Sequence, residues 1–211
     1  MLGQDLVAAL GIRPGAHEVT AVDRDSVDIV DPDACLAAVA GHDIVVNVAA
    51  WTSVDDAETH EAQAFEVNAV GAANLDRACY AAGAGRVQVS TDYVFDGTKT
   101  TPYTENDQAN PQNVYGRSKL AGEQAIEAAG IAHLILRTSW VYGARGSNFL
   151  LTMRRLAQQR DELRIVADQH GAPTWCRTIA DSTAHIVAQL AGSPGRDGKN
   201  NAEEFGERLQ A

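Results

Sequence analysis

The chain has few aromatic residues and no long apolar segment. The first shortage describes the expected interior, and the second argues against a membrane-spanning protein. Aromatic residues make up 6% of the 211 residues, although 45% are hydrophobic. This composition describes an Ala/Val/Leu-rich interior, which is common where helices pack on a parallel sheet. No stretch approaches the roughly 18 consecutive apolar residues of a membrane span, and no charged-then-apolar signal peptide opens the chain. We therefore expect no membrane partner.

Cysteine and positive charge are also scarce. The three cysteines, Cys35, Cys79 and Cys176, are widely spaced and lack a metal-ligand pattern. We interpret them as reduced structural thiols of a cytoplasmic protein, with a disulfide or a catalytic cysteine as the minority alternative. The formal net charge of −11 argues against a general nucleic-acid surface, because phosphate binding needs a positive patch. This net charge is compatible with a small nucleotide site built from local dipoles and a few basic side chains.

Short apolar runs alternate with segments of helical period, which predicts an α/β fold with a doubly wound, mostly parallel, Rossmann-like sheet. Asp31 and Pro32 indicate a helix start, and Gly41, Gly83 and Gly130 indicate helix ends. The predicted strands are 18–23, 43–49, 86–90, 133–138 and 163–167. The predicted helices are 4–10, 33–40, 61–82, 114–129, 148–160 and 178–190.

We divide the chain into a dinucleotide-binding domain at 1–143, a partial substrate-binding lobe at 144–191 and an unaligned tail at 192–211 that we expect to be disordered. A dinucleotide-binding unit opens with an apolar strand and a glycine-rich turn. This chain begins at Met1-Leu2-Gly3, already at the last glycine of such a turn, so we expect it to be truncated at both ends. The alternatives are a true start upstream of Met1, or a poorly folded and inactive product.

The residues that carry chemistry are Tyr115 and Lys119, four positions apart on a predicted helix, together with Thr91 at a strand end. Positions i and i+4 lie on one helical face, so the ammonium is expected to lower the tyrosine pKa from its usual value of about 10. Thr91 could add a hydrogen bond to the same reacting oxygen. Such a set suits the reduction of a carbonyl or the oxidation of an alcohol.

Five blocks in order carry a specific resemblance. They are 43–58 (DIVVNVAAWTSVDDAE), 89–97 (VSTDYVFDG), 113–123 (NVYGRSKLAGE), 136–143 (LRTSWVYG) and 168–174 (DQHGAPT). With these blocks, the chain resembles the extended short-chain dehydrogenase/reductases, and among them the dTDP-4-dehydrorhamnose reductases.

The resemblance implies that NADPH or NADH delivers hydride to the C4 ketone of dTDP-4-dehydro-L-rhamnose, giving dTDP-L-rhamnose. It implies that Tyr115 protonates the developing oxyanion, that Lys119 binds the nicotinamide ribose, and that Thr91 polarises the carbonyl. The cofactor carries the hydride chemistry, and the protein supplies position and a proton.

The resemblance also assigns binding residues around this centre. The residues assigned to the cofactor, besides Tyr115 and Lys119, are Leu2, Asp23, Arg24, Asp28, Ile29, Ala49, Ala50, Trp51 and Val89. The residues assigned to the dTDP-sugar are Val54, Asp55, Thr91, Asp92 and Trp140. Asp23 with Arg24 leaves NADH versus NADPH open, since an acidic residue favours a free ribose hydroxyl and an arginine accepts a 2′-phosphate.

Several alternatives stay open. Some members of the family hold Mg²⁺ at a dimer contact through glutamates, but the matching positions here are Asp5 and Arg177, so we predict no metal site. The resemblance allows a homodimer. Asp23 could be only a turn residue and Trp140 a core residue. Asn68 could have a buried hydrogen-bonding role beside the active site, or it could satisfy a nearby backbone carbonyl group. A non-catalytic regulatory subunit, or a nucleotide-sugar epimerase or dehydratase, is the alternative function.

Overall fold

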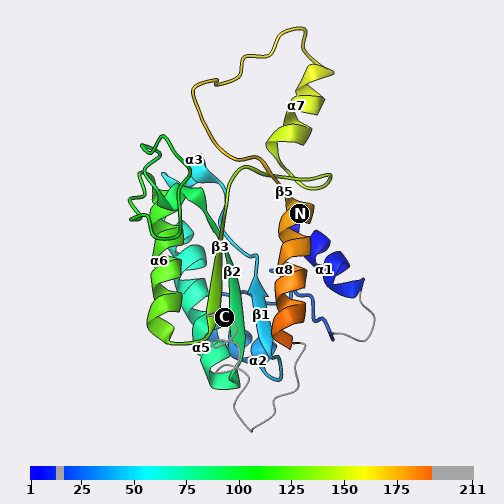
Figure 1. The fold of residues 1–211 in the computed structure, drawn as a ribbon, viewed down its shortest axis with the longest axis vertical. Coiled ribbons are helices and arrows are strands. Elements are labelled where there is room, and N and C mark those ends of the chain that lie inside the picture. Colours follow the sequence, from blue (N-terminus) through cyan, green and yellow to red (C-terminus); the bar gives the residue numbers. More distant parts are fainter. Residues whose placement is uncertain (13–16, 192–211) are drawn as a thin grey trace. The chain divides into compact units, whose positions relative to one another are not determined.

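The computed structural model describes residues 1–12 and 17–191, and Figure 1 shows their helices and strands. The predicted tail at 192–211 lies outside the described residues. The main helices are α1 (Leu2–Gly11), α2 (Pro32–Val39), α5 (Gly71–Ala82), α6 (Val114–Ala129), α7 (Phe149–Ala157) and α8 (Cys176–Ala191). Shorter helical segments are α3 (Val54–Ala57), α4 (Glu61–Phe65), a π-helical turn η1 (Glu66–Val70) and a 3-10 turn η2 (Asp92–Val94). The strands are β1 (Ile44–Asn47), β2 (Gly85–Thr91), β3 (His133–Thr138), β4 (Val141–Tyr142) and β5 (Thr174–Trp175).

The described residues group into two compact units. Among the described residues, one unit comprises 1–12, 17–21 and 138–191, and the other comprises 22–137. In the first, α1 packs against α8, and β4 pairs in parallel with β5. The second holds β1, β2 and nearly all of β3 together with helices α2 to α6. The predicted division at residue 143 stays a prediction.

The larger unit is built on a sheet of order β1-β2-β3. β1 and β2 are parallel, with Ile44 opposite Gly85 and Asn47 opposite Gln88. In parallel strands the carboxyl ends meet at one edge, so the segments that follow Asn47 and Thr91 leave the sheet on the same side. The predicted α/β class with a parallel sheet is confirmed. This edge carries the candidate site.

Two predicted strands are wrong. Residues 18–23 and 163–167 do not join a sheet in the described part of the chain, and Val22 and Val166 are exposed. An apolar run becomes a strand only where a neighbouring strand satisfies its backbone groups. The remaining predicted strands and all six predicted helices are present. The predicted helix at 61–82 contains the π turn at 66–70, which the sequence pattern did not indicate.

Local capping explains several boundaries. The Asp31 side chain accepts hydrogen bonds from the amides of Asp33 and Ala34, with Pro32 in the first helical turn. Gly83 and Gly130 end α5 and α6, each with φ of 66°. This left-handed conformation favours glycine, so the predicted ends of these two helices are confirmed.

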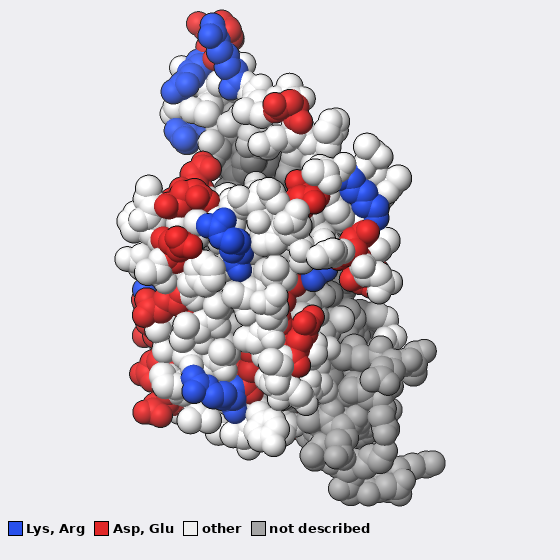
Figure 2. Space-filling view, turned by 90° about the vertical axis from the view of Figure 1, so that its left-hand side faces the viewer, with Lys and Arg blue, Asp and Glu red and all other residues white. Residues whose placement is uncertain are grey.

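No helix among the described residues is long and apolar enough to cross a membrane. Figure 2 shows acidic side chains over much of the described part of the face in view, with basic side chains in separate places among them. That nucleic acids do not bind stays a prediction.

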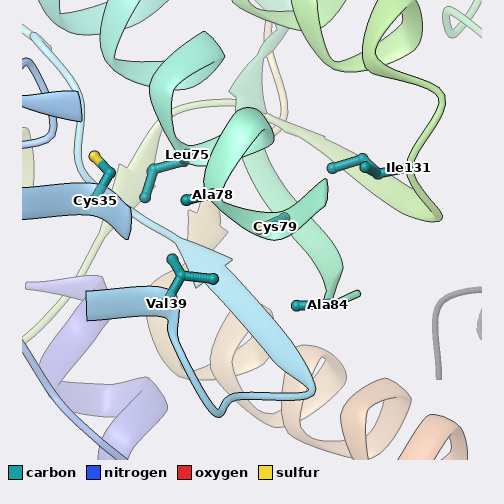
Figure 3. Close-up of a cluster of buried hydrophobic side chains, with 7 residues drawn as sticks. All are labelled: Cys35, Val39, Leu75, Ala78, Cys79, Ala84 and Ile131. Atoms are coloured by element: carbon teal, nitrogen blue, oxygen red, sulfur yellow. The ribbon is translucent and has the colours of Figure 1, made fainter. Parts of the chain in front are cut away.

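The main core cluster of the larger unit lies between α2 and α5. Figure 3 shows Cys35 and Val39 of α2 near Leu75, Ala78 and Cys79 of α5. All three cysteines of the chain are buried and free, so the predicted structural thiols are confirmed. Burial raises the pKa of the Cys79 thiol to about 11.

Candidate active site

The first turn of α6 positions the predicted tyrosine and lysine. Its N-cap, Asn113, accepts a hydrogen bond from the Gly116 amide at 2.7 Å. Tyr115 and Lys119 then follow one helical turn apart and are only 9% and 5% exposed. Both are therefore held in the protein interior, as functional groups on a rigid element.

Thr91 reaches the same place from the sheet. It is the last residue of β2 and the N-cap of η2, where its Oγ1 accepts a hydrogen bond from the Tyr93 amide at 3.2 Å. The Thr91 hydroxyl also donates a hydrogen bond to Asp92 Oδ1 at 3.2 Å, and the side chain lies close enough to Tyr115 to lower the pKa of its phenol. A Cβ atom on Gly116 would overlap the Tyr93 carbonyl oxygen, so glycine lets α6 approach η2 this closely. The structure thus brings together the three residues that the sequence singled out.

The predicted direction of the tyrosine pKa is wrong. Burial raises the pKa of Tyr115 above its usual value; the Thr91 hydrogen bond opposes this, and Asp92 and Tyr93 add to it. The ammonium of Lys119 instead donates a hydrogen bond to the Val89 carbonyl oxygen at 2.8 Å. Spacing along a helix showed that tyrosine and lysine share a face, but it did not show how strongly the phenol is buried.

The pKa of Lys119 is also shifted from its usual value. Burial lowers its pKa to about 8, the negative charge of Glu123 opposes that shift, and the positive charge of Arg86 adds to it. Near neutral pH this side chain is therefore still mostly charged, but it titrates within the range in which enzymes work. The phenol, in contrast, stays protonated.

Asn68 ties the loop after β1 to α6. Its side chain exchanges two hydrogen bonds with the Trp51 backbone, accepting from the amide at 2.9 Å and donating to the carbonyl oxygen at 3.1 Å. Its Nδ2 also donates to the Ser118 hydroxyl oxygen at 2.9 Å, and Ser118 donates to the Tyr115 carbonyl oxygen at 2.8 Å. The predicted buried hydrogen-bonding role of Asn68 is confirmed, and this network fixes the loop that carries Trp51.

The residues after β1 share the sheet edge with Thr91. The Ala49 amide donates to Asn47 Oδ1 at 2.9 Å, and the Trp51 indole donates to the Ser53 carbonyl oxygen at 3.1 Å. Ala50 completes this loop, and Val54 and Asp55 begin α3 directly after it. Of these residues, Ala49 and Asp55 are exposed, while Ala50, Trp51 and Val54 are partly buried. Their predicted contacts with cofactor and sugar stay predictions.

The residues predicted to hold the adenosine end lie in a turn before α2. Asp23 and Arg24 are exposed, and Asp23 Oδ1 accepts hydrogen bonds from the Ser26 amide at 3.2 Å and the Ser26 hydroxyl at 2.9 Å. The Asp28 carboxylate accepts from the Val30 amide at 3.0 Å. Ile29 packs against the core cluster of α2 and α5. Asp23 therefore has the turn role given as its alternative, and its ribose contact stays a prediction.

Leu2 and Trp140 belong to the other unit. Leu2 is partly buried in the first turn of α1. Trp140 is 44% exposed, so its alternative role as a core residue is wrong. It has φ of 46°, a conformation that favours glycine, and its carbonyl oxygen accepts a hydrogen bond from the Thr174 amide at 3.3 Å. Its predicted contact with the sugar stays a prediction.

The two positions compared with a magnesium site have other partners. Asp5 accepts a hydrogen bond from the Cys176 thiol at 2.6 Å and pairs with Arg145 at 3.8 Å. Arg177 pairs with Asp181 at 3.0 Å. The absence of a metal site stays a prediction.

Comparison with known proteins identifies the family. The family described as RmlD substrate binding domain matches residues 1–199. The chain belongs to this family.

Relatives of this RmlD-family chain share much of its sequence. It is 48% identical over 189 residues to the dTDP-4-dehydrorhamnose reductase of Burkholderia thailandensis, covering 89% of this chain and 62% of the relative. It is 46% identical over 197 residues to the enzyme of that name from Streptomyces griseus, covering 92% of this chain and 64% of the relative. The chain thus spans less than two thirds of the length of these curated relatives.

Solved structures of similar proteins have the same fold as this chain. The crystal structure of a dTDP-4-dehydrorhamnose reductase from Clostridium acetobutylicum matches with a TM-score of 0.85 and 37% identity, over 92% of this chain and 68% of that one. The dTDP-4-dehydrorhamnose reductase from Bacillus anthracis, in complex with NADP, matches with a TM-score of 0.84 and 35% identity, over 90% and 67%. The Rossmann-like fold expected for this RmlD-family chain is confirmed.

Sequence reasoning missed the charged residues behind the site. The buried Glu123 pairs with Arg137, which is partly exposed, and Asp76 of α5 pairs with Arg86 of β2. The only signal for Glu123 was its i+4 spacing from Lys119, because its partner lies on the following strand and the pairing depends on how that strand packs against α6.

Proposed function

We propose that this chain carries the reductase site of a dTDP-4-dehydrorhamnose reductase, which reduces the C4 ketone of dTDP-4-dehydro-L-rhamnose with a nicotinamide cofactor. The observation that carries this proposal is the convergence of Tyr115, Lys119 and Thr91 at the carboxyl edge of a parallel sheet. In open α/β sheets, ligands bind at that edge. The family and the names of its relatives support the choice of substrate.

The phenol of Tyr115 can supply the proton that the reduction needs. A ketone that accepts hydride becomes an alkoxide, which needs a proton donor within hydrogen-bond reach. Because burial raises the pKa of Tyr115, its phenol carries a proton at neutral pH and serves as the acid. Thr91, whose side chain lies beside the same phenol, would turn its hydroxyl from Asp92 to the substrate oxygen and orient it.

The residues present fit a nicotinamide cofactor, which supplies the hydride when bound. A lysine ammonium has three N–H donors, and Val89 accepts one of those of Lys119, so donors remain for ribose hydroxyls. Ala49 and Ala50 are small residues at the sheet edge and allow a phosphate group to approach the backbone. NADP in the relative from Bacillus anthracis supports NADPH as the first cofactor to test.

We further propose that the enzyme works in the cytoplasm, where reducing conditions keep buried thiols such as Cys35 and Cys79 free. A homodimer, which the family resemblance allowed, belongs to this proposal. Sedimentation of the purified chain at several concentrations tests it, and a monomer at every concentration contradicts it.

The test of function compares two tyrosine variants in the full chain. Tyr115→Phe removes the proton donor, so keto-sugar reduction should fall by about 10²- to 10⁴-fold, measured by loss of reduced-nicotinamide absorbance. Tyr80→Phe is the matched control, because Tyr80 is 73% exposed on α5 and should leave the rate unchanged.

Cofactor binding is measured separately by titrating the chain with NADPH and following nicotinamide fluorescence. Binding without turnover in the unsubstituted chain would favour the non-catalytic alternative. Equal rates for Tyr115→Phe and the parent would refute the proposed role of the phenol.

A further inference from the structure

A buried glutamate continues the functional face of α6. Glu123 lies one helical turn beyond Lys119, as Lys119 lies one turn beyond Tyr115, so the three side chains share a face. Glu123 is only 1% exposed. Glutamate is almost never fully buried unless it is paired, so its environment must satisfy the charge.

Arg137 of β3 holds this carboxylate. Its Nε donates to Oε1 and Oε2 of Glu123, each at 3.2 Å, and its Nη2 donates to Oε2 at 2.6 Å. The guanidinium also lies 5.1 Å from the centroid of the Phe95 ring, directly after η2. The carboxylate is therefore fixed between α6, β3 and the turn that begins at Thr91.

The fixed carboxylate opposes the effect of burial on Lys119, which favours the neutral amine. Lys119 donates to the Val89 carbonyl oxygen at 2.8 Å. The charged groups that act on it are Glu123 of its own helix, which favours the ammonium, and Arg86 of β2, which disfavours it. Arg86 is itself paired with Asp76. Tyr115, on the preceding turn, is neutral below its raised pKa.

The geometry points to Glu123 as a positioning residue. It is a buried anion, fixed by Arg137, that keeps the Lys119 side chain charged while its ammonium donates a hydrogen bond to the Val89 carbonyl oxygen. The value of a charged Lys119 for catalysis rests on the proposed function. The electrostatic link between the two side chains does not, so it is measured without substrate or cofactor.

The experiment follows lysine titration by NMR in the full chain labelled with ¹³C at the lysine Cε. The chain has only three lysines, Lys99, Lys119 and Lys199, and Lys119→Arg identifies the signal of interest. In the parent we expect a midpoint at about pH 8. In Glu123→Gln the midpoint should fall by about one pH unit, a tenfold loss of the charged form at a given pH.

Glu127→Gln is the matched control, because Glu127 is exposed one turn further along α6 and should leave the midpoint unchanged. Unfolding cannot imitate the expected result, since an unfolded lysine titrates near its usual pKa of about 10.4, which is a shift upward. An unchanged midpoint in folded Glu123→Gln overturns the inference.

A second variant decides the matter if Glu123→Gln does not fold. Arg137→Gln removes the cation that offsets the carboxylate but keeps an amide that can donate a hydrogen bond to it. The midpoint of Lys119 should then rise, and an unchanged or lower midpoint overturns the inference. A shift in these variants without reductase activity in the parent would refute the proposed function and leave the Glu123–Lys119 link intact.

Discussion

Replacing Asp76 by alanine should strongly destabilise the chain. Asp76 forms a buried ion pair with Arg86, whose side chain is 0% exposed. In Asp76→Ala, Arg86 keeps its hydrogen bonds to the Ala72 carbonyl oxygen and to Gln88 Oε1, both at 2.6 Å, but loses its counter-charge. A buried charge left without its partner costs about 3–5 kcal/mol.

Urea denaturation followed by circular dichroism measures this cost. For a slope of about 2 kcal/mol/M, a loss of about 4 kcal/mol moves the unfolding midpoint down by about 2 M. The control is Glu61→Ala, which removes an exposed ion pair with Arg117 at 3.7 Å and should cost at most about 1 kcal/mol. Equal midpoints for the two variants would refute the reasoning.

A double variant separates the cost of leaving one buried charge unpaired from the net contribution of the ion pair to stability. Within the described residues, Asp76 Oδ2 and Arg86 Nε have no hydrogen-bond partner, so the pair is incompletely satisfied. Replacing both residues, as in Asp76→Leu with Arg86→Met, should therefore be neutral or stabilising relative to the parent. A double variant as unstable as Asp76→Ala would show that the pair itself supplies the lost free energy.

The remaining predictions concern the site and the core. Gly116→Ala should push α6 away from the Tyr93 carbonyl, costing about 1–3 kcal/mol in urea denaturation and lowering turnover; unchanged turnover would contradict the close approach. Because the pKa of Lys119 is about 8, NADPH affinity should fall as pH rises through that value, and fluorescence titrations with a flat profile between pH 7 and pH 9 would argue against a cofactor role. The pKa of the Cys79 thiol, raised to about 11, should leave it unreactive toward a thiol reagent until urea unfolds the chain; rapid labelling of the native protein, read by mass spectrometry, would contradict its burial.

The sequence predicted the parts of the fold that depend on neighbours along the chain. The helix at 114–129 and the strand at 133–138 have the predicted bounds, because a cap at Asn113 and a glycine at Gly130 mark them locally. The strand predicted at 18–23 failed because pairing depends on a neighbouring strand, which an apolar run cannot reveal.

The same distinction applies to the site. The meeting of Thr91 with Tyr115 followed from ordered motifs, since both belong to blocks shared with a known family. The pKa direction of Tyr115 did not follow, because burial depends on everything packed around the ring. The sequence did not indicate a role for Arg137 for a similar reason, because its pairing with Glu123 depends on tertiary packing.

The π turn at 66–70 gives the helical run at 61–82 two phases. One extra residue in a turn rotates everything after it by about 100° relative to an uninterrupted α-helix. Ala64, before the turn, packs with Tyr115, whereas Leu75 and Cys79, after it, pack with α2. Deleting a single residue from 66–70 would restore an uninterrupted α-helix and rotate one of these two packing faces toward solvent. The length of this segment is therefore as constrained as its composition.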